Sequence, residues 1–185
     1  MSLAVPELRD EVIFLRRWNE GDIEANVAAC QDADAIRWMP RIPSPYDESD
    51  AWEFLAHSDK GWEEGTFYGF AIAERTTGRL VGSIGVSVND AIGEVGYFVF
   101  AGARRRGIGE RALRLVSRWA LQELDLARLQ LGVMVGNSAS ARLAEKTGFK
   151  REGILRSWME NHGARADVIM HSLLPGEVGR LSGDE

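Results

Sequence analysis

The sequence predicts an α/β (α+β) domain built on a mixed β-sheet of six to seven strands. Strand patterns at 67–74, 80–88 and 94–100 follow one another through short connections, which indicates antiparallel neighbours. A helix pattern at 108–124 then joins the third of these strands to a strand at 129–135, so those two should lie parallel. With 45% hydrophobic and 27% charged residues, a chain of 185 residues fits one domain.

The N-terminal third is predicted to hold one strand and two helices. An apolar run at 11–16 predicts the opening strand, and Asn19 precedes acidic residues in the manner of a helix cap. Three prolines between positions 40 and 45 then interrupt the chain. A second helix should begin at Asp47 or Ser49.

The C-terminal third is predicted to hold a short helix and a final pair of strands. Asn137 should cap a helix that runs to Thr147, where a glycine closes it. Strands at 150–159 and 164–174 follow. The polar residues 175–185 should fray.

The most informative stretch runs from Glu94 to Leu124. Its first seven residues alternate between the two faces of a strand, with Tyr97 on the face opposite Glu94. Behind them, apolar residues recur along one face of a helix that starts at Gly107 and Gly109. A glycine-rich turn that leads into a helix presents unpaired backbone N–H groups and the positive end of the helix dipole, so an anion is the predicted ligand.

Basic residues concentrate at this turn. Six arginines and one glutamate lie between Arg104 and Arg118, in a chain whose net charge is −6. This local excess predicts a ligand with more than one phosphate group. Glycines at 107 and 109 would let a phosphate approach the backbone without meeting a Cβ atom.

The spacing of Arg104, Gly107 and Gly109 has the form (Gln/Arg)-x-x-Gly-x-Gly, and here the chain resembles the GNAT N-acetyltransferases. The match continues through Asn137 and residues 145–149, a tail that is similar to the RimJ/RimL branch of ribosomal-protein N-terminal acetyltransferases. The resemblance implies the GNAT acyl-CoA N-acyltransferase fold, with helices on both faces of the central sheet. It also implies acetyl-CoA as the co-substrate and an amine as the acceptor.

The resemblance further implies which residues hold acetyl-CoA. The pyrophosphate would lie on the glycine-rich turn, and a backbone amide at 97–99 would polarise the thioester carbonyl. The side chain of Asn137 would contact the pantetheine arm. The cofactor-binding residues implied in this way are Tyr97, Phe98, Val99, Arg104, Arg105, Arg106, Gly107, Ile108, Gly109, Glu110 and Asn137.

Two other interpretations of the turn stay open. Gly107-x-Gly109-x-x-Ala112 also satisfies the dinucleotide fingerprint, with Asp125 as a ribose ligand. A Rossmann turn leaves its strand directly, however, whereas six residues separate Phe100 from Gly107, and the remaining chain lacks repeated strand–helix units. The other interpretation is a tight turn with a solvated arginine cluster.

Amine acetylation needs a base, because an alkylamine with a pKa near ~10 is mostly protonated at neutral pH. Enzymes of this branch often place a carboxylate that acts through water at the start of the central strand, which suggests Glu94. A solvated glutamate at a strand end is the structural alternative for Glu94. Glu160 and His162, before the last strand, are competing candidates for the base.

The leaving thiolate needs a proton donor. The position of Ser140, one helical turn after Asn137, suggests that it lies near the thioester sulfur. The wider family often has a tyrosine just before Glu-Lys for this role, whereas this chain has Ala144. A thiol pKa near ~8.5 is low enough for a serine or water to suffice. This departure leaves a CoA-binding protein without turnover as an alternative.

The acceptor is predicted from charge and resemblance. Residues 19–64 hold twelve acidic and three basic residues, together with Trp38, Trp52 and Trp62. In GNAT folds these early helices border the acceptor cleft, so the charge favours a cationic amine. The resemblance favours the α-amine of a protein or peptide N-terminus, and a polyamine or aminoglycoside is the alternative. Individually, most of these carboxylates would only solvate helix faces.

Composition argues against several other classes. Apolar runs are too short for a membrane helix and residues 1–10 lack a signal-peptide pattern, so a cytoplasmic protein is expected. Cys30, the single cysteine, excludes an internal disulfide and a cysteine-based zinc site, and no metal is expected. The negative net charge argues against nucleic acid as a partner. A homodimer is left open.

Overall fold

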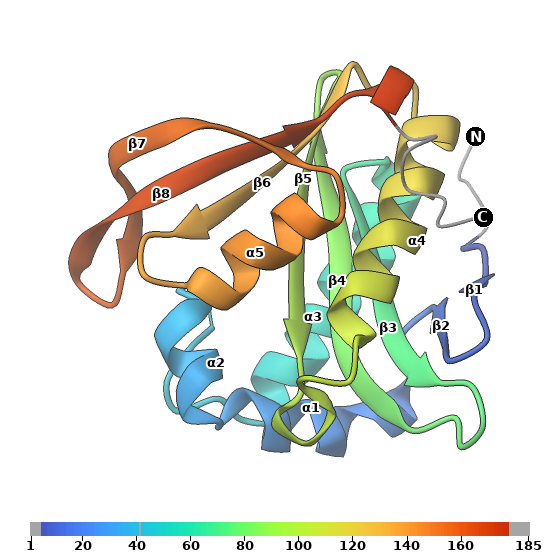
Figure 1. The fold of residues 1–185 in the computed structure, drawn as a ribbon. Coiled ribbons are helices and arrows are strands. Elements are labelled where there is room, and N and C mark those ends of the chain that lie inside the picture. Colours follow the sequence, from blue (N-terminus) through green and yellow to red (C-terminus); the bar gives the residue numbers. More distant parts are fainter. Residues whose placement is uncertain (1–4, 41, 178–185) are drawn as a thin grey trace.

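A mixed sheet of eight strands organises the described part of the chain (Figure 1). The structure is a computed structural model that describes residues 5–40 and 42–177. The strands are β1 (Leu8–Arg9), β2 (Ile13–Arg16), β3 (Phe67–Glu74), β4 (Leu80–Asn89), β5 (Ile92–Val99), β6 (Arg128–Met134), β7 (Lys150–Asn161) and β8 (Ala164–Leu173). Their order across the sheet is β1-β2-β3-β4-β5-β6-β8-β7. Among the strands described, only β5 and β6 pair in parallel, as predicted. The eighth strand is the two-residue β1, which was not predicted from the sequence.

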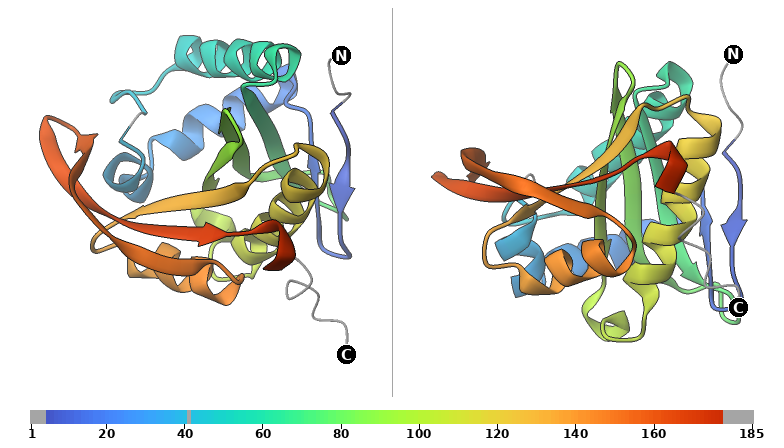
Figure 2. Two further views of the ribbon diagram at one scale, coloured as in Figure 1. Left: turned by 90° about the horizontal axis from the view of Figure 1, so that it is seen from above. Right: turned by 45° about the horizontal axis from the view of Figure 1, so that its top comes forward.

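Helices cover both faces of the sheet (Figure 2). The helical segments are η1 (Glu20–Asp22), α1 (Ile23–Cys30), α2 (Ala33–Trp38), α3 (Glu48–Glu64), η2 (Ala101–Ala103), α4 (Ile108–Glu123) and α5 (Ser138–Lys146). The early helices α1 and α3 lie on one face, and α4 and α5 lie on the other. The resemblance-based expectation of a two-sided arrangement is therefore confirmed.

Capping residues explain where α2 and α3 begin. Asp47 caps α3 by accepting hydrogen bonds from the amides of Ser49 and Asp50, as expected from the pattern. The single helix predicted after Asn19 is broken instead. Asp32 accepts from the amides of Asp34 and Ala35 and starts the separate six-residue helix α2. Asp32, in an extended conformation, therefore divides the predicted helix into α1 and α2.

Two apolar layers hold the fold together. One lies between the sheet and α4, where Ile108, Ala112 and Val116 are fully buried. The other lies beneath α1 and α3 and contains Trp18 and Cys30. The burial of α4 agrees with its predicted apolar face, and burial raises the pKa of the Cys30 thiol to about 11, which suits a packing role.

The described chain ends in a short turn after β8. Residues 175–177 form a turn in which the amide of Glu177 donates to the carbonyl of Leu174. The remainder of the stretch predicted to fray, 178–185, lies outside the described residues. None of the helices described is both long enough and apolar enough to cross a membrane.

Candidate functional site

The parallel strands β5 and β6 separate soon after they begin. They pair only at Ile92 with Arg128, Gly93 with Leu129 and Glu94 with Gln130, and then diverge (Figure 1). Within the described residues, the edge of β5 beyond Glu94 that faces β6 therefore has no ladder partner. This open edge includes residues 97–99, where the resemblance implies a backbone amide that polarises the thioester carbonyl.

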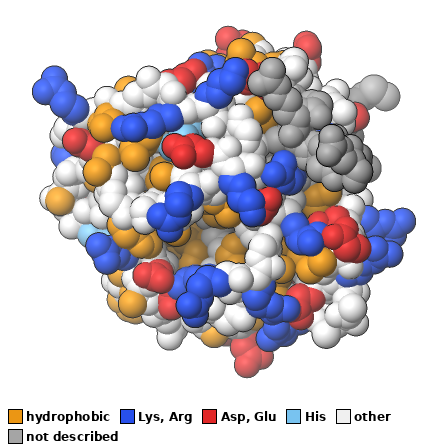
Figure 3. All heavy atoms as spheres, in the orientation of Figure 1, with side chains coloured by type: hydrophobic (Ala, Val, Ile, Leu, Met, Phe, Trp, Pro, Cys, Tyr) orange, Lys and Arg blue, Asp and Glu red, His pale blue; other side chains and the backbone are white. Residues whose placement is uncertain are grey.

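A cleft of about 860 Å³ follows this divergence through the molecule. One half is bounded by the loop before α4, the first turn of α4 and α5; the other is bounded by α2, α3, β4 and the tip of β7. We call these the loop half and the α2 half. Figure 3 shows a hollow in the face toward the viewer, with hydrophobic side chains at its floor and Lys and Arg side chains around it.

The loop half is built on the glycines that the sequence singled out. Gly107 has φ +77°, a left-handed conformation that favours glycine, and it directly precedes α4. Gly109 serves packing, because a Cβ atom there would lie 3.2 Å from Leu143 Cδ1 and 3.5 Å from Val99 Cγ2. The first amides of α4, from Ile108 to Glu110, open toward the cleft end of the helix, where an anion is favoured.

The arginine cluster of this loop is distributed among several partners. Arg106 forms an ion pair of 2.8 Å with Glu74. Hydrogen bonds from Arg79, Thr77 and Arg106 hold the pKa of Glu74 at about 2. Arg105 lines the cleft and, among the residues described, has no carboxylate partner. Of the three consecutive arginines, Arg105 is thus the best placed to meet an anion.

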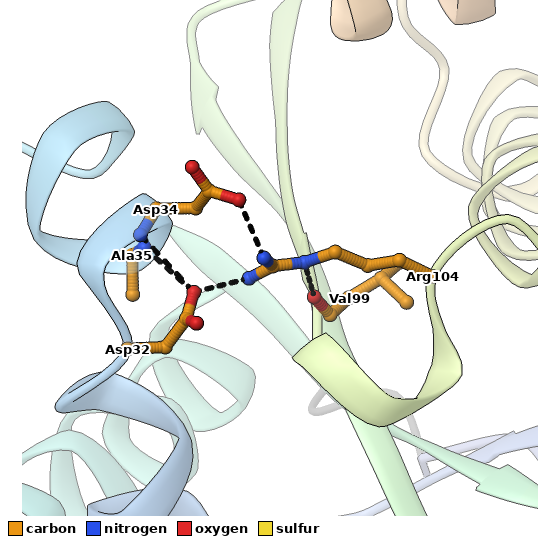
Figure 4. Close-up of polar contacts among 5 residues, drawn as sticks. All are labelled: Asp32, Asp34, Ala35, Val99 and Arg104. Atoms are coloured by element: carbon orange, nitrogen blue, oxygen red, sulfur yellow. Dashed lines mark hydrogen bonds and ion pairs between the residues drawn. The ribbon is translucent and has the colours of Figure 1, made fainter.

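Arg104 connects the loop to α2 (Figure 4). Its guanidinium donates to the Val99 carbonyl at 3.0 Å, to Asp34 at 2.6 Å and to Asp32 at 2.5 Å. The hydrogen bond from Arg104 lowers the pKa of Asp32, which is also the capping residue of α2. The side chain of Arg104 therefore joins the two halves of the cleft, and each of its three nitrogens donates to a protein group.

Two further cations meet at Glu110 in the first turn of α4. Its carboxylate lies 2.6 Å from Lys146 Nζ and 3.3 Å from Arg114. Burial alone would raise the pKa of Glu110, but the hydrogen bonds from Lys146 and Arg114 outweigh it and lower the pKa. This carboxylate ties α4 to α5 at the edge of the loop half.

Two hydroxyl groups meet where β5 passes α5. Asn137 caps α5 by accepting a hydrogen bond from the amide of Ser140, as predicted. The Ser140 Oγ lies 2.7 Å from the phenol oxygen of Tyr97, and both residues line the cleft. Burial raises the pKa of Tyr97, against the smaller lowering by the Ser140 hydrogen bond. The phenol therefore stays protonated at neutral pH.

From the sequence, Tyr97 is expected to contribute only its backbone, and the tyrosine typical of the family would stand at position 144. Ala144 is fully buried and packs in the core below α5. The alternation of β5 did place Tyr97 on the face opposite Glu94. That alternation was the available signal, but its meeting with Ser140 depends on where α5 docks.

Glu94 lines the cleft near the point where β5 and β6 part. Its carboxylate accepts a hydrogen bond of 3.1 Å from the Gln130 amide, which orients it. The competing bases lie outside the cleft lining. The carboxylate of Glu160 accepts from the amide of Gly163, and His162 Nε2 lies 2.7 Å from the Ile36 carbonyl oxygen. Geometry therefore favours Glu94 among the three.

The acidic residues of 19–64 are mostly engaged elsewhere. Only Asp34 among the twelve lines the cleft, and Arg104 neutralises it. The others with hydrogen-bond or ion-pair partners are Asp22 with Arg16, Asp32 with Arg104, Asp47 and Asp50 at the start of α3, Glu48 with Trp52, Asp59 with Arg17, and Glu64 with Lys60. The negative excess thus does not collect at the cleft.

The three tryptophans of the same span separate in space. Trp38 lines the cleft from the end of α2. Trp62 is buried and packs edge-on against Tyr68, whereas Trp52 is 41% exposed on α3. Only Trp38 is therefore available to a ligand in the cleft.

Comparisons with known proteins agree with this geometry. A family model described as Acetyltransferase (GNAT) domain matches residues 13–150. A Bacillus subtilis (strain 168) protein named Probable N-acetyltransferase YjcK is 35% identical over 174 residues, which cover 90% of this chain and 96% of that protein. RimJ of Mycobacterium smegmatis in complex with CoA-disulfide matches with a TM-score of 0.83 at 20% identity, over 96% of this chain and 92% of that one.

A RimL structure, a ribosomal alpha-N-protein acetyltransferase in complex with coenzyme A, also gives a TM-score of 0.83. Its identity is 15%, over 91% of this chain and 98% of that one. At these identities the two solved structures support the fold.

Proposed function

Because this chain belongs to the GNAT acetyltransferase family, we propose that it transfers the acetyl group of acetyl-CoA to the α-amine of a peptide or protein N-terminus. One observation carries the proposal. Alternation along β5 places Glu94 on one face of the central strand and the Tyr97–Ser140 hydroxyl pair on the other, where β5 diverges from β6. A base and an acid thus flank one cleft, as amide formation from a thioester requires.

The loop half has the chemistry to hold acetyl-CoA. The start of α4 supplies helix N–H groups and a partial positive charge for a pyrophosphate, and Arg105 adds a side-chain cation. The amides of Ile108, Gly109 and Glu110 are the proposed ligands of the phosphates. The edge of β5 at Tyr97, Phe98 and Val99 would receive the thioester arm, and Asn137 would border it.

Arg104 and Arg106 have a different role in this proposal. Their guanidinium groups hold Asp32, Asp34 and Glu74. They would keep the loop in shape for the phosphates, while Arg105 meets the ligand.

In the proposed reaction the neutral amine attacks the thioester carbonyl carbon, a C–N bond forms and the C–S bond breaks with its electron pair on sulfur. Glu94 takes the proton lost by the amine through a water molecule. The hydroxyl of Ser140 gives a proton to the thiolate and is resupplied by the Tyr97 phenol, 2.7 Å away. A backbone amide of β5 would stabilise the oxyanion. This pair supports turnover despite Ala144.

The α-amine is preferred over other acceptors for two reasons. RimL, a solved structure with the same fold, is described as a ribosomal alpha-N-protein acetyltransferase. The small polycations considered from the sequence also lose their main support, since the acidic residues of the N-terminal helices are largely paired or capping. A cytoplasmic location stays a prediction from the sequence, and a homodimer stays open.

Binding and turnover test the proposal separately. Calorimetry should show that acetyl-CoA binds and that NAD does not. Incubation with acetyl-CoA and a panel of peptides and small amines should release free thiol, and mass spectrometry should find the acetyl group on a peptide α-amine. Binding without thiol release for any amine would favour a CoA-binding protein without turnover. Tight NAD binding would favour a dinucleotide enzyme.

A further inference from the structure

The α2 half of the cleft has an apolar wall drawn from several elements. The lining side chains that form it are Trp38, Met39, Ile42, Phe54, Phe67 and Met159. They come from α2 and the segment after it, from α3, from the start of β3 and from the end of β7. A surface of this kind gains free energy by covering an apolar group, because it removes that group from water.

The floor of this half is a sheet surface with little side-chain cover. Gly69, Gly85 and Gly96 stand side by side across β3, β4 and β5. The ring of Phe67 fills the space over the first two, since Cβ atoms there would lie 2.8 Å and 2.6 Å from its edge. A Cβ atom at Gly96 would meet no atom within 4 Å. The space over Gly96 therefore opens into the cleft beside the Phe67 ring.

The outer side of this half is closed by Trp38. Its ring reaches from α2 toward the loop after β6, where a Cβ atom at Gly136 would lie 3.6 Å from Trp38 Cη2. His162 at the tip of the β7–β8 hairpin also contacts the carbonyl of Ile36 in α2. These contacts hold α2 against the loop after β6 and the β7–β8 hairpin, so that Trp38 and Gly96 line the same cleft.

Charge in this half is limited to one carboxylate without a cationic partner. Asp34 is neutralised by Arg104, and Glu94 contacts only the neutral amide of Gln130 among the described residues. The side chains of Glu94 and of position 96 face the same side of β5, two residues and about 6.6 Å apart. One amine at Glu94 and one apolar group over Gly96 would match this arrangement, whereas a polycation would leave charges unpaired.

We infer that the acceptor is a peptide whose first residue has a large apolar side chain, such as leucine, methionine or phenylalanine. This inference rests on the proposed function and specifies its substrate class. The α-amine lies by Glu94 at the divergence of β5 and β6. The first side chain lies over Gly96 between Phe67, Met39 and Trp38, and the rest of the peptide leaves the cleft.

A peptide series tests the substrate class. Peptides of one sequence and charge would differ only in the first residue, which would be leucine, phenylalanine, methionine, alanine, serine or glycine, and spermidine would represent the polycations. The initial rate of thiol release gives kcat/KM for each. The large apolar residues should exceed serine and glycine by about 10-fold or more, the order of discrimination that an apolar pocket achieves.

Two variants test the assigned location. Gly96→Val fills the floor and should lower kcat/KM for the leucine peptide about tenfold more than for the glycine peptide. Phe67→Ala removes part of the wall and should also reduce the ratio between these peptides. Gly153→Val is the matched control, because Gly153 is a strand glycine outside the cleft with open space at its Cβ position, and it should leave the ratio unchanged.

The outcomes separate this inference from the proposed function. Turnover with no preference for apolar first residues, or with a preference for spermidine, would overturn the inference and leave an acetyltransferase. An apolar preference that both cleft variants leave intact would also overturn the assigned site. Acetyl-CoA binding with no amine turned over would overturn both. Because each ratio compares two peptides on one protein, a general loss of activity in a variant cannot imitate the expected result.

Discussion

The two halves of the cleft are built from different kinds of chemical group. The loop half is mostly backbone: the first turn of α4, the left-handed Gly107 and the unpaired edge of β5. The α2 half is mostly side chains, contributed by short elements that are distant in sequence. A backbone site can be specified by a few adjacent residues, whereas a side-chain site depends on how separate elements meet. The first half should therefore tolerate side-chain changes better than the second.

The largest expected effect concerns Glu94 in its proposed role as base. Glu94→Gln keeps the hydrogen-bonding shape toward Gln130 but removes the proton acceptor. We expect kcat/KM to fall about 10²-fold at neutral pH with acetyl-CoA affinity unchanged, because general bases contribute at least that much. Glu123→Gln, on the exposed end of α4, is the control. A loss below about threefold across a pH series would retire Glu94 as the base.

The hydroxyl pair should give the next largest effect. Tyr97→Phe and Ser140→Ala each interrupt the proposed relay to sulfur, and we expect each to lower kcat about tenfold, less than for a base since a thiolate leaves readily. Because the two hydroxyls act through one relay, the double variant should be no slower than the slower single variant. Single-turnover rates with saturating acetyl-CoA measure this. Multiplicative losses would show that the two hydroxyls act independently.

Two adjacent arginines, Arg105 and Arg106, offer a direct test of the loop half. Arg105→Gln should weaken acetyl-CoA binding by about fivefold, because it removes the cation that lines the cleft. Arg106→Gln should change the Kd less than twofold, since that guanidinium is bound to Glu74. Titration calorimetry at two salt concentrations compares them. Equal losses would mean that the phosphates attract the arginines away from their protein partners.

Breaking the ion pair between Arg104 and Asp34, which joins the two halves, should have a smaller effect that is confined to the KM of the acceptor. Arg104→Gln and Asp34→Asn each break the contact of 2.6 Å between the loop and α2. We expect the acceptor KM to rise about threefold with little change in acetyl-CoA Kd, in keeping with a partly exposed ion pair. The double variant should match Arg104→Gln alone, because that substitution already removes the contact with Asp34. A main effect on acetyl-CoA binding would instead assign Arg104 to the phosphates.

The smallest effect concerns the anchor of the loop at Glu74. The pKa of Glu74 is about 2 in the folded protein, below the value near ~4.3 expected in the unfolded chain. The ion pairs of Glu74 therefore stabilise the fold fully above pH ~4.3, and this stabilisation is lost as the pH falls toward 2. The difference in Tm between the protein and Glu74→Gln should be a few degrees at most, because Arg79 and Arg106 are exposed. It should stay constant from pH 7 to 5 and shrink below. A difference that grows on acidification would contradict this sign.

The same contrast explains what could be predicted from the sequence. Alternation and glycine spacing predicted β5, α4 and the parallel pair with β6, because these elements form from neighbouring residues and one crossover. The predicted cap at Asn137 is confirmed for the same reason. Local patterns thus carried the fold and the backbone of the loop half.

What the sequence could not supply is the pairing of distant side chains. Arg104, Arg105 and Arg106 have the same chemistry in the chain, yet they face α2, the cleft and Glu74 respectively. The meeting of Tyr97 with Ser140 depends on the docking of α5, and the neutralisation of Asp34 depends on the break that starts α2. Charge counted along 19–64 therefore overstated the field at the cleft.

The short pairing of β5 with β6 gives the sheet an edge in its interior. Three residue pairs form a narrow backbone seam between the strands, and beyond it β6 and α5 are held to the rest of the fold by side chains of the core that they share with α4. Amide exchange should concentrate at such a seam, since few backbone hydrogen bonds must break to open it. A ligand that binds the folded cleft and not the unfolded chain would stabilise the entire fold by mass action. The cohesion of the molecule and the occupancy of its cleft are therefore linked through one strand edge.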